Sequence, residues 1–196
     1  MKKYLNLVLV VLFTTFFIIV PANAQKRNVG KEAQKLSYGA KAGFNIASLT
    51  SSEDQSRIGL CIGVFGEYKV RKDFGISVDL LYSQQGAENE VEGIAVGLLL
   101  DYLNIPILAN LELFDGLSVK AGLQPGFLLS SKFYIAGISV DYDDANSIDF
   151  SIPIGLSYTF DFGVLIDVRY NLGLTKVADE LSDKNSVFQI TLGYKF

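Results

Sequence analysis

The sequence predicts an all-β protein: an eight-stranded antiparallel up-and-down β-barrel that crosses a membrane. Three observations support this class. Of the 196 residues, 49% are hydrophobic and only 19% are charged, which is a high hydrophobic content for a water-soluble domain. After residue 24 the hydrophobic residues alternate with small polar ones instead of forming another run of about twenty. The alternating segments recur eight times, and the chain ends on one of them.

The N-terminal segment has the pattern of a secretory signal peptide. Two lysines precede an apolar run over residues 5–20, and small residues follow up to Ala24. We expect cleavage between Ala24 and Gln25. A retained membrane helix is the alternative, but the run is short and ends at Pro21. Residues 1–24 are therefore predicted to be removed on export, and residues 25–35 to form a flexible periplasmic lead.

The charge balance argues against a nucleic-acid partner. Removing residues 1–24 takes away two lysines and no acidic residue, so the formal net charge changes from −4 to −6. The remaining chain is mildly acidic, has no basic footprint for nucleic acid and fits one domain.

Residues 36–196 are predicted to form the barrel domain, because eight segments there have the period of two that gives a strand two unlike faces. The strands are expected at residues 38–46, 58–70, 74–83, 102–112, 117–130, 149–160, 164–173 and 187–196. In strand order, residues that represent the opposed faces are Phe44 and Lys41, Val64 and Glu67, Val78 and Asp79, Ile107 and Asn110, Leu123 and Lys120, Ile154 and Ser151, Ile166 and Asp167, and Ile190 and Gln189.

The connections alternate between short and long, which is typical of outer-membrane barrels. Tight turns are expected at residues 71–73, 114–116 and 161–162, and long loops at 47–57, 87–98, 131–147 and 175–185. Within the third long loop, residues 133–142 alternate weakly, so two strands could continue above the membrane there. An even strand number places both chain ends on the short-turn, periplasmic side, and the longer loops are then extracellular.

A water-soluble barrel of the lipocalin type is the competing fold, and periodicity alone does not show which face is outside. A water-facing exterior should be rich in Lys and Glu. The polar faces here are mostly Gly, Ser, Asn, Gln and Thr, which suits a narrow packed interior. Aromatic residues near the strand ends of the apolar face also favour a membrane barrel.

Ten isolated charged residues fall on the polar faces, five of each sign. They are Lys41, Lys69, Lys120, Arg169 and Lys195, and Glu67, Asp79, Glu112, Asp149 and Asp167. Because an unpaired buried charge is costly, we expect these residues to form an inward charge network that plugs the lumen, so that the barrel conducts poorly or not at all. A proton relay or small-ion path through them is the alternative.

Three further features have structural interpretations. Pro106, Pro125 and Pro153 interrupt predicted strands and are expected to mark bulges near a rim. Cys61 stands alone on an inward face and is expected to be a small packed residue. The acidic stretch 141–144 could bind calcium, but a solvated acidic loop is the better interpretation, because the stretch lacks the glycine and distal glutamate of a calcium loop.

Enzymatic activity is not expected. The sequence contains no histidine, which excludes Ser-His-Asp and Cys-His arrangements and the usual zinc sites. We predict no catalytic, cofactor-binding or metal-binding residues. A lipid-modifying enzyme with a serine or carboxylate site remains the alternative within this class.

Several short motifs together resemble the PorT-like family of eight-stranded outer-membrane β-barrel proteins common in Bacteroides-type bacteria. They lie at Tyr38–Asn45, Leu80–Gly86, Tyr102–Pro106, Gly126–Ser130, Arg169–Leu174 and Gly193–Phe196. The resemblance covers nearly the whole mature chain, with Pro125 before Gly126 as a departure. It implies the outer membrane of a Gram-negative cell envelope and a link to type IX secretion.

The predicted function is therefore that of a non-enzymatic outer-membrane barrel that presents loops to an envelope or secretion partner. Its other expected partners are outer-membrane lipid and the barrel assembly machinery. Tyr194 and Phe196, at the aromatic end of the last strand, are expected to act as the assembly signal. The alternative is a small outer-membrane pore or a lipid-modifying enzyme.

Overall fold

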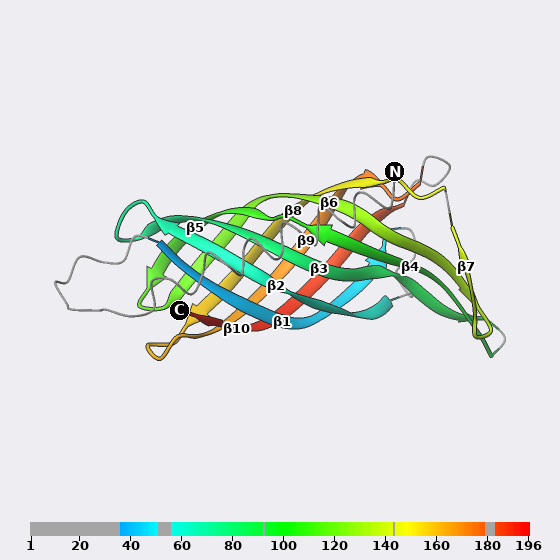
Figure 1. The fold of residues 1–196 in the computed structure, drawn as a ribbon, viewed down its shortest axis with the longest axis horizontal. Coiled ribbons are helices and arrows are strands. Elements are labelled where there is room, and N and C mark those ends of the chain that lie inside the picture. Colours follow the sequence, from blue (N-terminus) through cyan, green and yellow to red (C-terminus); the bar gives the residue numbers. More distant parts are fainter. Residues whose placement is uncertain (1–35, 51–55, 92, 143, 179–182) are drawn as a thin grey trace, which may run out of the picture. The chain divides into compact units, whose positions relative to one another are not determined.

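The computed structural model describes residues 36–50, 56–91, 93–142, 144–178 and 183–196, and these ranges contain ten strands (Figure 1). The strands are β1 (Leu36–Leu49), β2 (Ser56–Lys69), β3 (Phe74–Val91), β4 (Ile94–Asn104), β5 (Ile107–Phe114), β6 (Leu117–Ile135), β7 (Ile138–Asp141), β8 (Ile148–Thr159), β9 (Val164–Lys176) and β10 (Lys184–Lys195). No helix in these ranges is long and apolar enough to cross a membrane.

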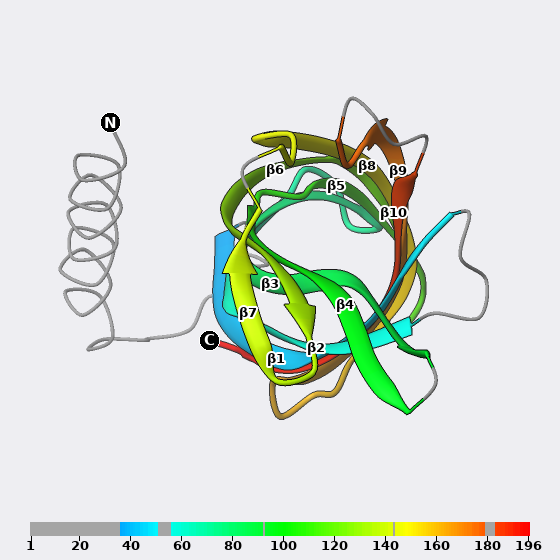
Figure 2. The same cartoon turned by 90° about the vertical axis from the view of Figure 1, so that its right-hand side faces the viewer.

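The strands close into an antiparallel barrel with eight wall positions. β4 and β5 follow one another in the wall, since both pair with β3 and with β6. β7 lies outside the wall and pairs with β6. The first and last strands meet along the seam from Gly39–Lys195 to Leu49–Asn185, and Figure 2 shows the closed ring in end view. The predicted fold class is therefore confirmed.

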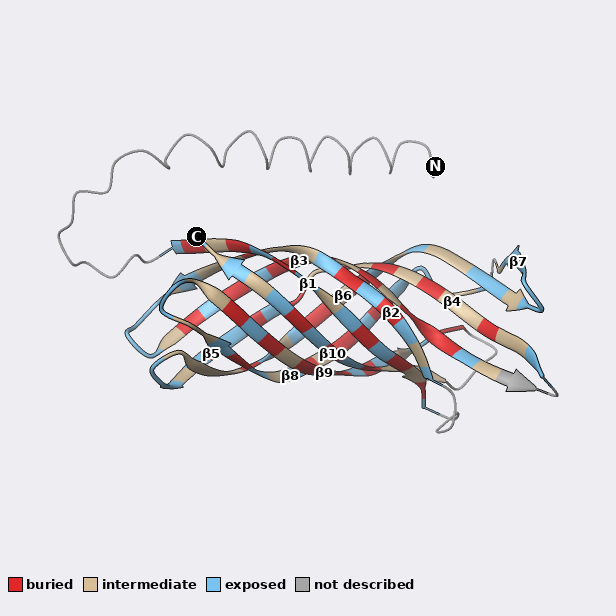
Figure 3. Ribbon diagram, turned by 90° about the horizontal axis from the view of Figure 1, so that it is seen from below, coloured by how far each residue is buried: buried red, intermediate tan, exposed pale blue. Residues whose placement is uncertain are grey.

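The barrel is polar inside and hydrophobic outside, the reverse of a water-soluble protein. Buried and exposed residues alternate along each wall strand (Figure 3). Apolar side chains such as Phe44, Ile154 and Leu192 are exposed by 62%, 54% and 60%, whereas Asp79 and Arg169 are 1% exposed. A continuous exposed hydrophobic surface of this kind needs a lipid environment.

The two rims differ. We call one rim the short-turn end, because tight turns join β2 to β3, β5 to β6 and β8 to β9 there. β1 begins and β10 ends at the same rim. At the opposite rim, the long-loop end, the prediction of a loop over residues 87–98 is wrong. β3 continues to Val91 and β4 begins at Ile94, and the two pair as a hairpin as far as these residues.

The strands at the long-loop end form a sheet that extends past the barrel (Figure 1). We call it the protruding sheet and define it as residues 86–91 of β3, 94–100 of β4, 131–135 of β6 and all of β7. The alternation over residues 133–142 thus reflects a real hairpin, with β6 ending at Ile135 and β7 beginning at Ile138. Its two-residue turn has positive φ at both Ala136 (50°) and Gly137 (87°), as tight β-hairpin turns require.

The three strand prolines do not mark bulges, contrary to the prediction. The pairs Asn104–Gly126 and Ile107–Leu123 on either side of Pro106 have the same register, so the proline ends β4 without shifting the wall. Instead, the carbonyl of Pro106 accepts a hydrogen bond from the amide of Asp79. Pro125 likewise accepts from Ile105, and Pro153 pairs in register with Asn171. The nearby register shift falls between Asp101 and Tyr102 instead, where the wall has no proline.

Candidate functional site in the barrel lumen

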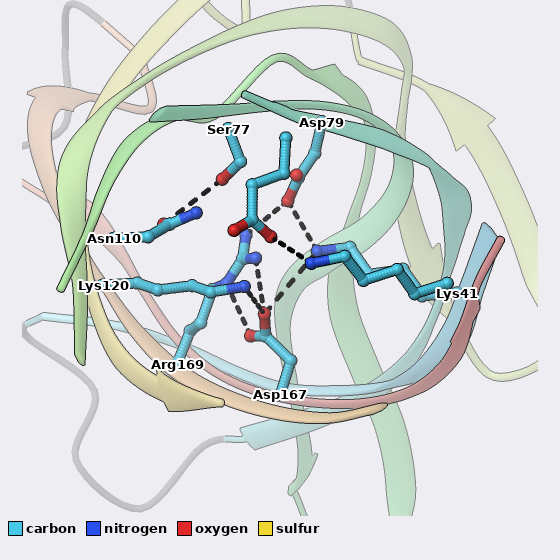
Figure 4. A network of polar contacts seen from close by, with 9 residues as sticks. Lys41, Ser77, Asp79, Asn110, Lys120, Asp167 and Arg169 are labelled. Atoms are coloured by element: carbon cyan, nitrogen blue, oxygen red, sulfur yellow. Dashed lines mark hydrogen bonds and ion pairs between the residues drawn. The ribbon is translucent and has the colours of Figure 1, made fainter. Parts of the chain in front are cut away.

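Five of the ten predicted inward charges meet in one buried cluster near the middle of the lumen (Figure 4). Lys41 comes from β1, Asp79 from β3, Lys120 from β6, and Asp167 and Arg169 from β9. Period-two alternation turns each of these side chains inward, and closure of the barrel brings the four strands around one axis. We call these five residues the central charge cluster.

Arg169 holds the cluster together. Its Nη1 lies 2.6 Å from Asp79 Oδ2, and its Nε and Nη2 lie 2.6 Å from the two carboxylate oxygens of Asp167. Lys41 Nζ is 2.5 Å from Asp79 Oδ2 and 3.9 Å from Asp167 Oδ2, and Lys120 Nζ is 3.3 Å from Asp167 Oδ2. A planar guanidinium suits this position because its fixed donors reach two carboxylates at once.

Four more of the predicted charges form two pairs at the short-turn end. Lys69 Nζ lies 2.7 Å from Glu112 Oε2, and Lys195 Nζ lies 3.0 Å from Glu67 Oε2. Both pairs line a polar cavity of about 210 Å³ whose wall also includes Lys120 of the central charge cluster. We call this cavity the vestibule.

Asp149, the tenth predicted charge, is not part of this network. It lies on β8 towards the long-loop end and is 5% exposed. Its Oδ1 accepts a hydrogen bond of 2.7 Å from the hydroxyl of Thr175. Among the described residues it has no ion pair, so the structure brings nine of the ten predicted charges into ion pairs and leaves this one apart.

Beyond the central charge cluster, amide and hydroxyl side chains fill the lumen. Asn45 donates to the hydroxyl of Ser83 over 2.9 Å, and Gln124 donates to that of Ser151 over 3.0 Å. Sequence reasoning did not single out these residues. Their inward position could still have been predicted from the sequence. Asn45 follows Lys41 by four residues and Ser83 follows Asp79 by four, so each lies on the same strand face as that charged residue.

An apolar cluster lies between this polar layer and the long-loop end. It consists of Leu49, Ala87, Leu100, Tyr102 and Val177, with Leu98, Leu128 and Ala145 packed against it. It joins β1, β3, β4 and the residue that follows β9, and includes the base of the protruding sheet. Charges, amides and apolar side chains thus follow one another along the axis.

The remaining predicted residues have varied positions. Tyr194 and Phe196 are exposed and in ring contact at 5.3 Å, and the Phe196 ring lies 5.8 Å from that of Tyr38.

Ala24 and Gln25, with the signal peptide and the periplasmic lead, lie outside the described residues. Cys61 is fully buried without a disulfide. In the described part of the chain, no three His, Cys, Asp or Glu residues gather as metal ligands.

A closed barrel with a polar lumen and a hydrophobic exterior defines an integral β-barrel membrane protein. Residues 23–179 match the family model described as outer membrane protein beta-barrel domain, and the chain belongs to this family. The fold and the family place the protein in the outer membrane.

Similar solved structures support the fold. Ail, the attachment invasion locus protein of Yersinia pestis, in complex with the heparin analogue sucrose octasulfate, is 16% identical with a TM-score of 0.54, and the match covers 83% of this chain and 99% of Ail. Neisserial surface protein A is 13% identical with a TM-score of 0.50, covering 83% of this chain and 97% of that protein. A search of curated proteins finds no match.

Proposed function

We propose that this protein is a non-enzymatic outer-membrane barrel with a closed lumen that binds a partner protein through the protruding sheet. The observation that carries the proposal is the pair of open strand edges on this sheet. Among the residues that the structure describes, β7 pairs with β6 on one side only, and β3 beyond Gly86 pairs with β4 only. An open edge offers backbone donors and acceptors to a strand of another chain.

The side chains of the β6–β7 hairpin suit such a partner. Phe133, Ile135, Ile138 and Val140 are exposed by 41%, 43%, 64% and 59%. A partner strand added to β7 would bury part of this apolar surface and pair the open backbone edge at the same time.

The charge of the protruding sheet favours a basic protein over a polyanion as the partner. Glu88 and Asp141 are exposed on its two hairpins and Asp144 is exposed just after β7, and Lys132 is the exposed lysine of these hairpins. Ail was crystallised with a heparin analogue, but an acidic surface repels sulfate groups. The resemblance to PorT-like barrels extends the proposal to a component of a type IX-like secretion apparatus.

Site-specific photocrosslinking in outer membranes of the native host tests the proposal. A benzophenone amino acid placed at Ile138 should give a discrete adduct with one protein, identified by mass spectrometry. The same probe at Phe162, an equally exposed residue of the β8–β9 turn (65% against 64%), controls for random collisions at the opposite rim. Equal labelling at both positions, or no adduct at Ile138, would contradict the proposal.

The alternatives are a small pore and a lipid-modifying enzyme. The central charge cluster and the apolar cluster argue against a water-filled path, because both fill the lumen with side chains. A purified barrel that turns over lipid would favour the enzyme.

A further inference from the structure

The central charge cluster contains three cations and two anions. Lys41, Lys120 and Arg169 face Asp79 and Asp167, and all five side chains are at least nine-tenths buried. The two ion pairs nearer the rim are each neutral, and Asp149 lies in the other half of the lumen. The central charge cluster therefore has a net charge of one positive unit. Such an excess is costly in a poorly solvated site.

Lys120 is the least well satisfied of the three cations. An ammonium group has three N–H donors, yet among the described residues its one ion-pair contact is Asp167 Oδ2 at 3.3 Å. That oxygen already accepts the shorter bond of 2.6 Å from Arg169 Nη2. Two donors of Lys120 are thus left for other acceptors, and Figure 4 shows its side chain pointing into the lumen.

The vestibule gives these donors a place for a ligand. Lys120 lies in its wall together with the hydroxyl residues Ser118, Ser157 and Thr159. Its volume of about 210 Å³ is several times the roughly 30 Å³ that one water occupies in the liquid. Asp161 also borders the vestibule, but it is exposed in a turn, where solvent and salt screen its charge.

We propose that the vestibule is a binding site for a small oxyanion, a carboxylate or a phosphate group, with Lys120 at its inner end. The anion would accept the two remaining donors of Lys120 and neutralise the excess charge, and the hydroxyl groups would bind its other oxygens or its uncharged remainder. Lys69 and Lys195 contribute less, because each is already paired with a glutamate. The site is independent of the protruding sheet and of any partner bound there.

Titrations of the ¹⁵N-labelled barrel in a phosphate-free detergent test this site. Inorganic phosphate and acetate are added separately at constant ionic strength, with chloride as the balancing anion. We expect saturable shifts of the amide signals of Ser118 and Ser157, and competition between the two anions. The anion that binds more tightly identifies the chemical class. Shifts that grow linearly with both anions, or no shifts, would overturn the proposal, because a network that neutralises itself by losing a lysine proton needs no anion.

Two matched variants place the site. Lys120→Met should weaken binding about tenfold or more, the loss expected for a charge-assisted hydrogen bond. Lys72→Met removes an exposed lysine from the turn at the same rim and should leave the affinity unchanged. If both variants bind as the wild type does, the proposal is overturned, because the anion then does not bind at Lys120. If Lys120→Met does not fold, Ser157→Val should weaken binding in a barrel of unchanged heat-modifiability, and unaltered binding would overturn the proposal.

Discussion

Arg169 illustrates how one side chain joins strands that are not neighbours in the wall. Its guanidinium connects Asp167 on its own strand to Asp79 on β3, across the lumen. All three side chains are 1% exposed, so removing the guanidinium would leave two buried carboxylates with lysines alone as partners. The cost of such a change comes mainly from the three contacts of 2.6 Å that the two buried carboxylates lose, even though two lysines remain to balance their charge.

We therefore predict that Arg169→Met lowers the free energy of unfolding by about 3–5 kcal/mol. Lys69→Met is the matched control. It breaks a pair whose side chains are 35% and 28% exposed, so it should cost no more than about 1 kcal/mol. Urea titrations of the barrel in phospholipid vesicles, followed by the gel shift of the folded form, measure both. Similar losses for the two variants would contradict the central role of Arg169.

At this scale the sequence predicts the face of a residue better than its partner. Period-two alternation alone placed Lys41, Asp79 and Arg169 on the inward face, and all three are buried in the structure. The alternation could not show that Asp149 lies apart from the others, because the position of a side chain along the barrel axis depends on strand tilt and register. Register is a property of the closed barrel and is not written in any one strand.

Among the elements, β10 closes the barrel and ends in aromatic contacts. The amide of Phe196 donates a hydrogen bond of 2.8 Å to the carbonyl of Tyr38 on β1, and the Phe196 ring contacts those of Tyr38 and Tyr194. The last residue thus extends the seam between the first and last strands by one step.

We predict that deleting Phe196 lowers the amount of folded, heat-modifiable barrel in the outer membrane. The loss of the terminal seam contacts acts in this direction, and so would the loss of the aromatic assembly signal predicted from the sequence. Phe162→Ala is the control, since it removes an exposed aromatic residue from the same rim outside the seam. Semi-native gel electrophoresis of outer membranes gives the folded fraction, and wild-type levels in the deletion variant would show that Phe196 is dispensable.

The strands that could be predicted from the sequence are those in which hydrophobic and polar residues alternate without interruption. The regular alternation of β2 and β10 gave strands close to those observed. The β3–β4 hairpin was missed because Gly86, Gly93 and Gly97 dilute the hydrophobic signal, and because a strand that leaves the lipid no longer needs an apolar outer face. For Pro106, the sequence showed that the ladder must be interrupted but not that the register survives.

For the whole molecule, the order of layers along the axis determines what can pass. From the short-turn end inward come the vestibule, the central charge cluster, the amide layer and the apolar cluster. An ion entering the vestibule would have to displace Arg169 or Lys41 from carboxylates at 2.5–2.6 Å and then cross an apolar layer. Both steps are unfavourable.

We predict that the purified barrel gives no large, stable single-channel conductance in planar bilayers. Flickering, small currents are compatible with side-chain motion in the vestibule. A protein of known porin activity, reconstituted by the same procedure, is the positive control. A steady open level comparable with that of the porin would refute the closed lumen and favour the small-pore alternative.

The position of Arg169 also has a consequence for how the chain enters the bilayer. Its partner Asp79 is 90 residues away in sequence, so no single hairpin carries both. A hairpin of β8 and β9 inserted alone would expose Arg169 to lipid with only Asp167 as its partner. Asp79, the other partner, is brought by β3 only when that strand joins the same ring. Insertion is therefore expected to be concerted, with the charges neutralised as the wall closes and not hairpin by hairpin.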